Sequence, residues 1–378
     1  MSVAGIVFSN IHDSNLPELT KSRTVASVPF GCRYRFIDFA LSNFVNSNIF
    51  DIMVIAHYNY QSLMEHVGSG KDWDLARRSG GVKILPPYIT AHANYTNTLY
   101  SSRLEALKSV SYVLRDLTAD YIVMTDCDVI CNIDFTELIK YHVESGADMT
   151  TAVRTVELNE KMAQSSTVYM SDLDGNVTDI YVKPQGYTGS ADVGLNISVV
   201  SRKFLEMIVM DSIAHGYTSM TKDIILRNIG KYKFNVYKYD GYFACIRSFE
   251  DYFEDSMKLL DEDGEFRTAL FKEKNRPIYT RVRNSIPTRY KTGSAVTNSL
   301  IADGCVIEGT VENSILFRGV KVSRNATVRN CILMQGTYVG ENSYLNCVVS
   351  DRDATVRDGR LLSGVPEQPY YISKDQTI

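Results

Sequence analysis

Residues 298–359 read NSLIADGCVIEGTVENSILFRGVKVSRNATVRNCILMQGTYVGENSYLNCVVSDRDATVRDG, and this stretch decides the fold of the C-terminal part of the chain. Aliphatic side chains recur about every six positions, for example from Ile301 to Ile307, from Val322 to Val328 and from Val339 to Leu345. A six-residue period is typical of a parallel β-helix, in which each repeat forms one side of a coil and buries its aliphatic side against its neighbours. We therefore predict a β-helix (hexapeptide-repeat) domain over residues 292–378.

The N-terminal part carries short, almost continuous apolar runs at Val3–Phe8 (VAGIVF), Ile52–Ala56 (IMVIA) and Tyr121–Met124 (YIVM). Such runs are typical of strands that are buried on both faces of a parallel sheet. Between the second and third runs, apolar residues recur at helical spacing and predict an amphipathic helix. They are Leu99, Leu104, Leu107, Val110 and Leu114. The alternation predicts an α/β fold with a doubly wound sheet, whose ligands lie at the C-terminal ends of its strands.

The middle of the chain is richer in β-strand patterns. Asp174-Gly175 stands between two alternating runs and is a strong hairpin signal. Further on, residues 265–291 carry charges and prolines without an apolar period, which is typical of a connection between domains. The sequence thus divides into a nucleotidyltransferase-like α/β domain at 1–265, a linker at 266–291 and the β-helix domain at 292–378.

Composition excludes several classes of function. The 378 residues carry a formal net charge of −4, which provides no basic surface for nucleic acid. No segment approaches the roughly 20 apolar residues of a membrane span, and the N-terminus has no signal-peptide pattern. We expect a cytoplasmic protein that binds neither nucleic acid nor membrane. Its seven cysteines include no CxxC pair, so reduced and mostly buried thiols are expected.

The most informative block is RTVASVPFGCRYRFIDFALSNFVNSNIFDIMVIAHYNYQSLMEHV, Arg23–Val67. It resembles the signature of bacterial glucose-1-phosphate adenylyltransferase, or ADP-glucose pyrophosphorylase, which has the form R-A-K-P-A-V-x-F-G-G-K-Y-R-x-I-D-F-x-L-S-N. The matching residues are Val28, Phe30, Gly31, Tyr34, Arg35, Ile37, Asp38, Phe39, Leu41, Ser42 and Asn43. The resemblance covers nearly the whole chain. It implies a Rossmann-like nucleotidyltransferase domain with a mixed, mostly parallel sheet, followed by a left-handed parallel β-helix.

The turn after the first strand departs from the family pattern. Catalytic members have a glycine-rich L-A-G-G-x-G-x-R-L there, whose backbone N–H groups and arginine hold the nucleotide triphosphate. Glycine is needed because only glycine lets the backbone approach the phosphates closely. The corresponding stretch Ser9–Leu16 has no glycine and no arginine, and its Asp13 would repel phosphate. The family lysine of R-A-K-P is replaced by Val25.

A second departure concerns the metal site, since phosphoryl transfer needs a cation that bridges phosphate oxygens, and Mg²⁺ takes hard oxygen ligands. Asp126 and Asp128 lie two positions apart at the end of the third strand and would point to one face; the alternative is an ordinary polar strand end. In the resemblance, Asp128 falls on the G-D-H aspartate that serves catalysis and metal binding. The partner aspartate of G-Y-W-x-D-V-G aligns with Cys245, a soft and poor ligand for Mg²⁺. We expect Asp128 to be vestigial and the metal site to be incomplete.

The sugar-phosphate side retains part of the family pattern. Lys183 matches the E-K-P lysine that binds the phosphate of glucose 1-phosphate, but the preceding sugar-binding glutamate is replaced by Val182. Asp223 matches the aspartate of the family K-D-I-I. A solvated lysine beside a turn and a helix cap are equally good accounts of Lys183 and Asp223.

The site lacks the glycine-rich turn, the lysine of R-A-K-P and the second metal-binding aspartate. These three losses predict a chain that is nearly inactive alone, because the removal of one preorganised charge-stabilising donor typically lowers the rate by about 10²- to 10³-fold. The departures resemble those of the GlgD-type subunit found beside a catalytic GlgC-type subunit. The resemblance implies a non-catalytic or weakly catalytic regulatory subunit of glucose-1-phosphate adenylyltransferase, which makes ADP-glucose and pyrophosphate from ATP and glucose 1-phosphate in glycogen biosynthesis. It also implies a heterotetramer with the catalytic homologue, no cofactor in this chain and Mg²⁺ in the partner.

The sequence leaves two alternatives to the regulatory function. The first is a competent sugar-1-phosphate nucleotidyltransferase with a repaired active site. The second is a hexapeptide-repeat acyltransferase, which is disfavoured because such enzymes generally use a histidine base and no histidine follows His215.

Effectors of the family are phosphorylated sugars, and basic residues near the altered turn could form a pocket for an effector phosphate. They are Lys21, Arg23, Arg33 and Arg35. The alternative is that they are ordinary surface charges. The chain alone could also form a homo-oligomer.

Overall fold

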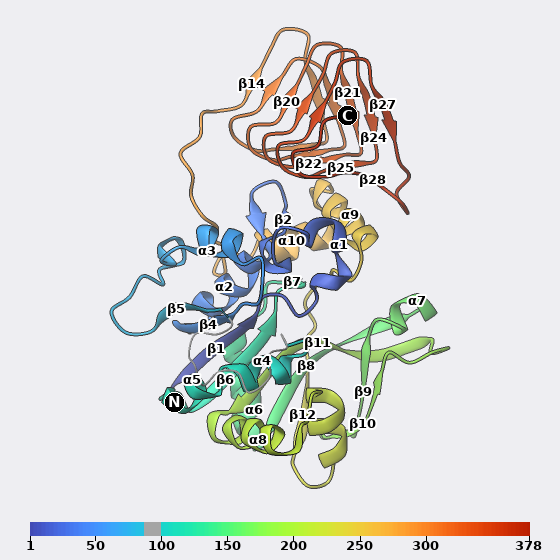
Figure 1. The fold of residues 1–378 in the computed structure, drawn as a ribbon. Coiled ribbons are helices and arrows are strands. Elements are labelled where there is room, and N and C mark those ends of the chain that lie inside the picture. The colour runs from blue at the N-terminus through green and yellow to red at the C-terminus, as the bar shows by residue number, and fades with distance from the viewer. Residues whose placement is uncertain (87–99) are drawn as a thin grey trace.

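The computed structural model describes residues 1–86 and 100–378, which form an α/β domain and a β-helix packed against it (Figure 1). A nine-stranded sheet in the order β10-β9-β11-β6-β1-β4-β5, with β8 beside β11 and β12 beside β8, is the centre of the first domain. Its strands span Val3–Phe8 (β1), Asp51–Ile55 (β4), Gly81–Leu85 (β5), Tyr121–Asp126 (β6), Met149–Leu158 (β8), Thr167–Ser171 (β9), Val177–Val182 (β10), Gly189–Ser201 (β11) and Phe234–Lys238 (β12). The neighbours β6, β1, β4 and β5 are parallel, whereas β11 is antiparallel to β6 and β8. The predicted α/β fold with a mixed sheet is confirmed.

Helices cover both faces of this sheet, and each face has its own hydrophobic core. One face is covered by α2 (Phe36–Asn46), α3 (Gln61–Val67), α6 (Phe135–Ser145) and α9 (Phe249–Met257), the other by α4 (Arg103–Ser109), α5 (Ser111–Asp116) and α8 (Arg202–His215). The helix predicted over 99–114 is present as α4 and α5, which are separated at Val110; Leu99 lies outside the described residues. At the break, the Ser109 hydroxyl donates to the carbonyl of Ala106 at 2.7 Å and competes with the helical backbone pattern.

The predicted hairpin turn at Asp174-Gly175 joins β9 and β10, which are antiparallel. Gly175 has φ of 80°, a conformation that favours glycine. The hairpin extends from one side of the molecule close to α7 (Glu160–Ala163), as Figure 1 shows.

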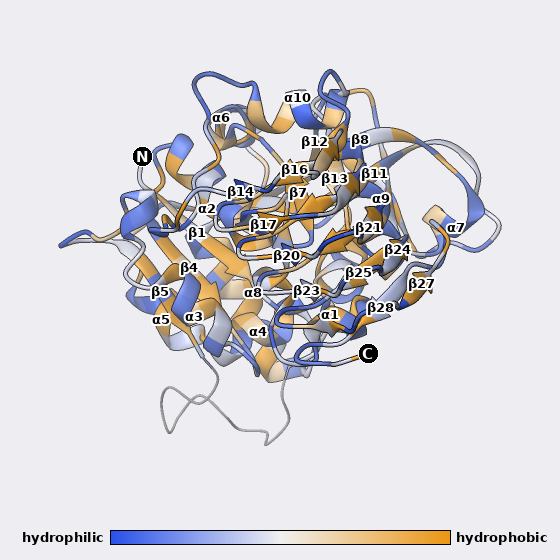
Figure 2. Ribbon diagram, turned by 90° about the horizontal axis from the view of Figure 1, so that it is seen from above, coloured by the Kyte–Doolittle hydropathy of each residue, from blue (hydrophilic) through white to orange (hydrophobic). Residues whose placement is uncertain are grey.

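The C-terminal domain is a parallel β-helix built from three five-stranded sheets. In chain order from β14 to β28, its strands span Arg289–Tyr290, Ala295–Thr297, Leu300–Ile301, Val306–Ile307, Thr310–Glu312, Ile315–Leu316, Lys321–Val322, Thr327–Arg329, Ile332–Leu333, Tyr338–Val339, Tyr344–Asn346, Val348–Ser350, Thr355–Val356, Leu361–Ser363 and Tyr370–Ile372. Inward aliphatic side chains stack from coil to coil, as in the column Ile307, Val322, Val339 and Val356. The strands of both domains carry most of the hydrophobic residues, whereas many connecting loops are hydrophilic (Figure 2). The predicted β-helix is confirmed.

Asparagines stabilise one corner of the β-helix coils. Asn298, Asn313 and Asn330 adopt positive φ values of 39°, 47° and 50°, which asparagine tolerates better than most residues. Their side-chain amides form a ladder that continues to Asn346, with N···O distances of 2.9, 2.6 and 2.9 Å. Each coil is therefore joined to the next at this corner by a side-chain as well as a backbone hydrogen bond.

The segment predicted as a linker, 266–291, is irregular only in its middle. Helix α10 occupies Glu265–Phe271, and β14 of the β-helix begins at Arg289. Phe266 and Leu270 lie one turn apart on α10, and both are buried in the core of the α/β domain. This pair is too short a pattern to produce a visible period, which is why the sequence did not indicate the helix.

The two domains share a hydrophobic core and a buried ion pair. Phe317 and Met334 of the β-helix belong to the same cluster as the residues under α2 and α9. Within this junction Arg23 Nη2 lies 2.7 Å from Asp351 Oδ1, and both side chains are 3% exposed. The Tyr371 hydroxyl lies 3.2 Å from the second oxygen of Asp351. The orientation of the β-helix is thus fixed by a charged contact that water does not reach.

We expect Asp351→Ala to lower the free energy of unfolding by about 3–5 kcal/mol, because it leaves the Arg23 guanidinium buried without its partner. Chemical or thermal unfolding of the purified chain measures this. A matched control is Lys291→Ala, which removes the exposed pair between Lys291 and Glu308 in the same domain and should change stability by less than about 1 kcal/mol. Equal stability of the two variants would contradict the role given to Asp351.

Candidate functional site

The turn Ser9–Leu16 follows β1 at the C-terminal edge of the parallel strands, where the sequence predicts a ligand site. Half of its eight backbone N–H groups, those of Ser9, Asp13, Asn15 and Leu16, donate to carbonyls inside the protein. The N–H of Ser9 donates to the carbonyl of Ile55 at 3.1 Å, and those of Asn15 and Leu16 donate to carbonyls within the turn at 2.9 and 3.2 Å. A phosphate-binding loop needs N–H groups that point outward together. In this turn, four of those groups are instead held by carbonyls of the protein itself.

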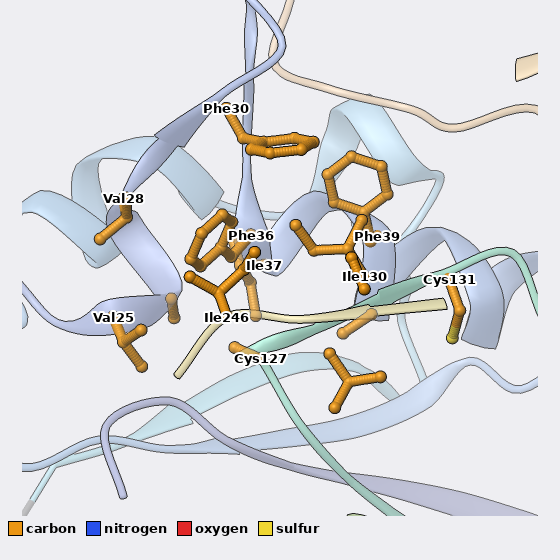
Figure 3. Packing of buried hydrophobic residues seen from close by; sticks show 14 of the residues in the cluster. Val25, Val28, Phe30, Phe36, Ile37, Phe39, Cys127, Ile130, Cys131 and Ile246 are labelled. Atoms are coloured by element: carbon orange, nitrogen blue, oxygen red, sulfur yellow. The ribbon is translucent and has the colours of Figure 1, made fainter. Parts of the chain in front are cut away.

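Asp13 and Val25, the two departures nearest this turn, are joined by a hydrogen bond. The Val25 N–H donates to Asp13 Oδ1 at 2.7 Å, and the Asp13 side chain is buried. Burial raises the pKa of Asp13 to about 7, although the hydrogen bond from Val25 acts in the opposite direction. The side chain of Val25 packs among Val28, Ile37 and Ile246 in the core (Figure 3). The position of the family lysine has therefore become part of the hydrophobic core.

Asp126 and Asp128 come together at the end of β6, as their spacing predicts, and both are buried. Two residues that the sequence did not single out contact them. His12 Nε2 lies 2.8 Å from Asp126 Oδ2 and 3.8 Å from Asp128 Oδ2. Arg103, at the start of α4, places Nε 2.9 and 3.0 Å from the two carboxylate oxygens of Asp126. The four side chains form one charged cluster, which we call the β6 cluster.

The β6 cluster separates the pKa values of its two aspartates. Burial alone would raise both, but Arg103 and His12 together hold the pKa of Asp126 below its usual range. Asp128 has no such direct guanidinium contact, and burial together with the negative charge of Asp126 raises its pKa despite the nearby His12. Asp126 is therefore the ionised member of the pair, with Arg103 as its counter-ion.

Cys245 lies next to this cluster, where the family has a second metal-binding carboxylate. It ends β13 (Phe243–Cys245), which pairs with β7 (Val129–Cys131), and the N–H of Ile246 donates to the carbonyl of Asp128 at 2.9 Å. Burial raises the pKa of the Cys245 thiol to about 12, so the group is neutral at ordinary pH. A neutral thiol and an arginine-paired carboxylate are unsuitable ligands for Mg²⁺. The residues present do not fit the metal that the family resemblance implies.

Among the described residues, Lys183 and Asp223 do not line the cavity beside Arg103. The cavity next to Arg103, which is also lined by Thr151, Tyr169 and Asn196, has a volume of about 30 Å³, whereas ligand pockets have about 300–1,000 Å³. Lys183 is exposed on a turn after β10, with φ of 52°. Asp223 accepts the N–H groups of Thr218 and Ser219 at 3.0 and 2.9 Å, and these bonds lower its pKa. Asp223 thus binds the backbone N–H groups at the start of its own helical turn, next to the N-cap residue Ser219.

The four predicted effector residues separate in the structure. Arg33 and Arg35 line a cavity at the domain junction, Lys21 is exposed and does not line it, and Arg23 is paired with Asp351. Arg23 is neither a surface charge nor a lining residue of this cavity, because Asp351, distant in sequence, reaches it through the β-helix. Three arginines that the sequence did not indicate complete the cavity: Arg283, Arg318 and Arg352.

Crowding of positive charge defines this cavity, which we call the arginine cavity. Burial and then the charges of Arg352, Arg23 and Arg283 lower the pKa of Arg35 to about 10. The arginine cavity itself has a volume of about 40 Å³, and it opens beside a second cavity of about 340 Å³ that shares Arg283, Arg318 and Gln335 with it, so a ligand larger than one phosphate group would have to extend into the second cavity. Within the described part of the chain, Arg23 Nη1 and Arg352 Nε are buried without a hydrogen-bond partner. Only the folded junction reveals this group, since its members come from both domains and the linker.

Comparison with known proteins agrees with this architecture. Residues 13–262 match the nucleotidyl transferase family, and residues 285–368 match the GlmU-like C-terminal hexapeptide family. The chain is 32% identical to the glycogen biosynthesis protein GlgD of Bacillus subtilis over 370 residues, which covers 98% of this chain and 95% of that protein. It is 31% identical to the glucose-1-phosphate adenylyltransferase of Thermosipho africanus (87% of this chain, 78% of that protein) and 30% identical to that of Halalkalibacterium halodurans (86% and 84%). The chain belongs to the glucose-1-phosphate adenylyltransferase family.

Membership of the glucose-1-phosphate adenylyltransferase family confirms the predicted resemblance, including its GlgD-type relatives, and connects the chain with glycogen biosynthesis. Among the described residues, the structure contains no helix that is both long and apolar enough to cross a membrane. The altered turn, Val25 and the β6 cluster are therefore features of a family member and not of an unrelated α/β protein.

The buried Asp13 predicts a pH dependence of stability. Its folded-state pKa of about 7 lies above the value of an unfolded chain, so this contribution to stability is present at low pH and is lost as the pH rises toward and past 7. We expect the wild-type chain to lose about 2–3 kcal/mol of unfolding free energy between pH 5 and pH 8 relative to Asp13→Asn, whose amide oxygen can still accept the Val25 N–H. Denaturant unfolding at both pH values measures this difference. Parallel pH profiles of the two proteins would show that Asp13 ionises normally.

Proposed function

We propose that this chain is a non-catalytic or weakly catalytic regulatory subunit of glucose-1-phosphate adenylyltransferase in glycogen biosynthesis. The observation that carries the proposal is the β6 cluster, in which Arg103 and His12 occupy the carboxylates that would otherwise serve a metal and a nucleotide. The turn Ser9–Leu16 supports it, since the turn has no glycine and no arginine and half of its backbone N–H groups donate inside the protein. Catalysis of phosphoryl transfer depends on positioning and charge stabilisation, and this site lacks the means for both.

The proposed partner is a homologous catalytic subunit, GlgC-type, in a cytoplasmic heterotetramer, with Mg²⁺ held by that partner and none by this chain. A fold retained across both domains with an altered site is consistent with a role in assembly. The regulatory effect would be a shift in the population of partner conformations, which requires contacts that differ between those conformations.

The proposed effector is a sugar phosphate, and its proposed binding site is the arginine cavity. Of the four candidate residues that the sequence indicates, this cavity includes Arg33 and Arg35. Guanidinium groups recognise phosphate through two parallel hydrogen bonds. Arg33 and Arg35 come from the α/β domain, while Arg318 and Arg352 come from the β-helix. An anion bound among them would offset their mutual repulsion and contact both domains, so its binding energy would depend on the orientation of the domains.

Rates measured with and without the partner test the assignment. We expect the purified chain with ATP, glucose 1-phosphate and Mg²⁺ to turn over at least about 10³-fold more slowly than its catalytic homologue, because several charge-stabilising groups are missing. We also expect the two chains to co-purify and the mixture to differ from the homologue alone in rate, substrate affinity or effector response. Turnover of the isolated chain within about tenfold of the homologue would establish the competent nucleotidyltransferase instead. An unchanged rate, affinity and effector response in the mixture would exclude regulation.

Substitutions in the arginine cavity test the effector proposal. We expect Arg283→Gln and Arg352→Gln each to weaken binding of a hexose 1,6-bisphosphate by about tenfold, because a charge-assisted hydrogen bond contributes about 1.5–3 kcal/mol. Titration calorimetry on the purified chain, with inorganic phosphate as a second probe, measures this. Lys21→Gln is the matched control, since Lys21 is exposed and lies off the cavity. Equal weakening in Lys21→Gln, or binding that neither arginine affects, would contradict the assigned site.

A further inference from the structure

Two buried carboxylates two residues apart need compensation for their charge. Asp126 and Asp128 are 1% and 2% exposed, and burial of an unpaired charge is too costly to persist. In phosphoryl-transfer sites a divalent cation supplies positive charge to such carboxylates. In this chain the positive group within hydrogen-bonding distance is a side chain, Arg103.

We propose that Arg103 is a built-in replacement for the divalent cation, and that the β6 cluster is a metal-independent structural centre. The guanidinium engages both oxygens of Asp126 in the two-pronged geometry that arginine and carboxylate favour. His12, in the turn that follows β1, makes a further hydrogen bond with Asp126. One carboxylate thus receives contacts from two other elements, as a metal ion would receive ligands.

A cation and Arg103 cannot both occupy this place. The oxygens of Asp126 that would coordinate a metal already accept from Arg103 and His12, and an added divalent ion would face a guanidinium at close range. Two other groups remain near the centre, Asp128 Oδ1, which has no partner among the described residues, and the neutral Cys245 thiol. His12, Asp126 and Asp128 place ligand atoms within 4.8 Å of one another, but the oxygens of Asp126 already accept from Arg103 and His12, which leaves Asp128 as the one free carboxylate of this group. Mg²⁺ usually needs one or two free carboxylates together with waters, and here a guanidinium lies beside them.

The cluster joins three segments that are distant in sequence. His12 belongs to the turn after β1, Asp126 ends β6, and Arg103 begins α4. Because Arg103 carries its charge at every physiological pH, this junction needs no bound ion to persist. The inference deepens the proposed function, because both rest on the β6 cluster. Their tests remain distinct, since metal binding to this chain is measured without the partner and a regulatory effect is measured only with it.

Manganese provides the test, because Mn²⁺ accepts carboxylate and imidazole ligands and its free ion is measured directly by electron paramagnetic resonance. We expect the wild-type chain to bind no Mn²⁺ at millimolar concentration and its midpoint of thermal unfolding to move by less than about 1 °C. Arg103→Ala should lower that midpoint by about 6 °C or more, since it breaks a buried pair. Added Mn²⁺ should then restore at least about half of the loss, because Asp126, Asp128 and His12 become available as ligands.

Two further variants control the interpretation. Arg103→Lys keeps a positive charge and should show no Mn²⁺ response. Arg202→Ala removes a pair with Glu206 on α8 in which the arginine is exposed to the same extent as Arg103 but the carboxylate is 34% exposed, so it should change neither the unfolding midpoint nor the response to Mn²⁺. Binding of one Mn²⁺ per wild-type chain that is lost in Asp126→Asn would overturn the proposal, and this measurement needs no Arg103 variant to fold. An Arg103→Ala protein as stable as the wild type and indifferent to Mn²⁺ would overturn it as well.

Discussion

The buried pair of Arg23 and Asp351 is the contact on which the rest of the molecule depends. Removing two charges from water is costly, and the cost is offset only where geometry and further hydrogen bonds are good. Here the Tyr371 hydroxyl and the Arg352 backbone N–H complete the coordination of Asp351. Any slip of one β-helix coil would separate the pair, so the contact specifies one orientation of the domains. The arginine cavity exists only in that orientation, because each domain contributes part of its wall.

In the altered nucleotide site, as at the Arg23–Asp351 pair, buried charged groups are stabilised by hydrogen bonds from other parts of the chain. Three of its carboxylates accept hydrogen bonds from other groups of the chain: Asp13 from a backbone N–H, Asp126 from Arg103 and His12, and Asp223 from two N–H groups. Only Asp13 Oδ2 and Asp128 Oδ1 are buried there without a partner among the described residues. A group that is already satisfied gains little from a ligand, since binding would exchange one good hydrogen bond for another. The arginine cavity differs in that positive groups face one another and two buried donors remain without a partner in the described residues. The molecule therefore offers unsatisfied positive groups at the junction of its domains, whereas the guanidinium at the edge of its sheet is paired with Asp126.

Local periodicity was sufficient to predict the domains and most strands from the sequence, because strand and coil patterns are set by neighbouring residues. Asp126 and Asp128 could be placed together for the same reason, since their spacing fixes their faces. Arg103 and His12 could not, because they reach Asp126 across 23 and 114 positions and neither carries a motif. The partner of Arg23 lies 328 positions away, on a coil whose stacking register is a tertiary property. Helix α10 was missed because only Phe266 and Leu270 anchor it, and two apolar residues make no period.

The burial of Val25 makes it costly for this position to return to the lysine of the catalytic relatives. Its side chain is 2% exposed in a core of aliphatic and aromatic residues (Figure 3). A return to lysine at this position would bury an ammonium group among them, at a cost of several kcal/mol unless the group lost its proton. A loss of the Asp13 carboxylate would likewise remove the acceptor of a buried N–H. Each single reversion lowers stability before nucleotide binding could return, so the path back is closed to stepwise selection. The loss of the nucleotide site is therefore difficult to reverse by single substitutions.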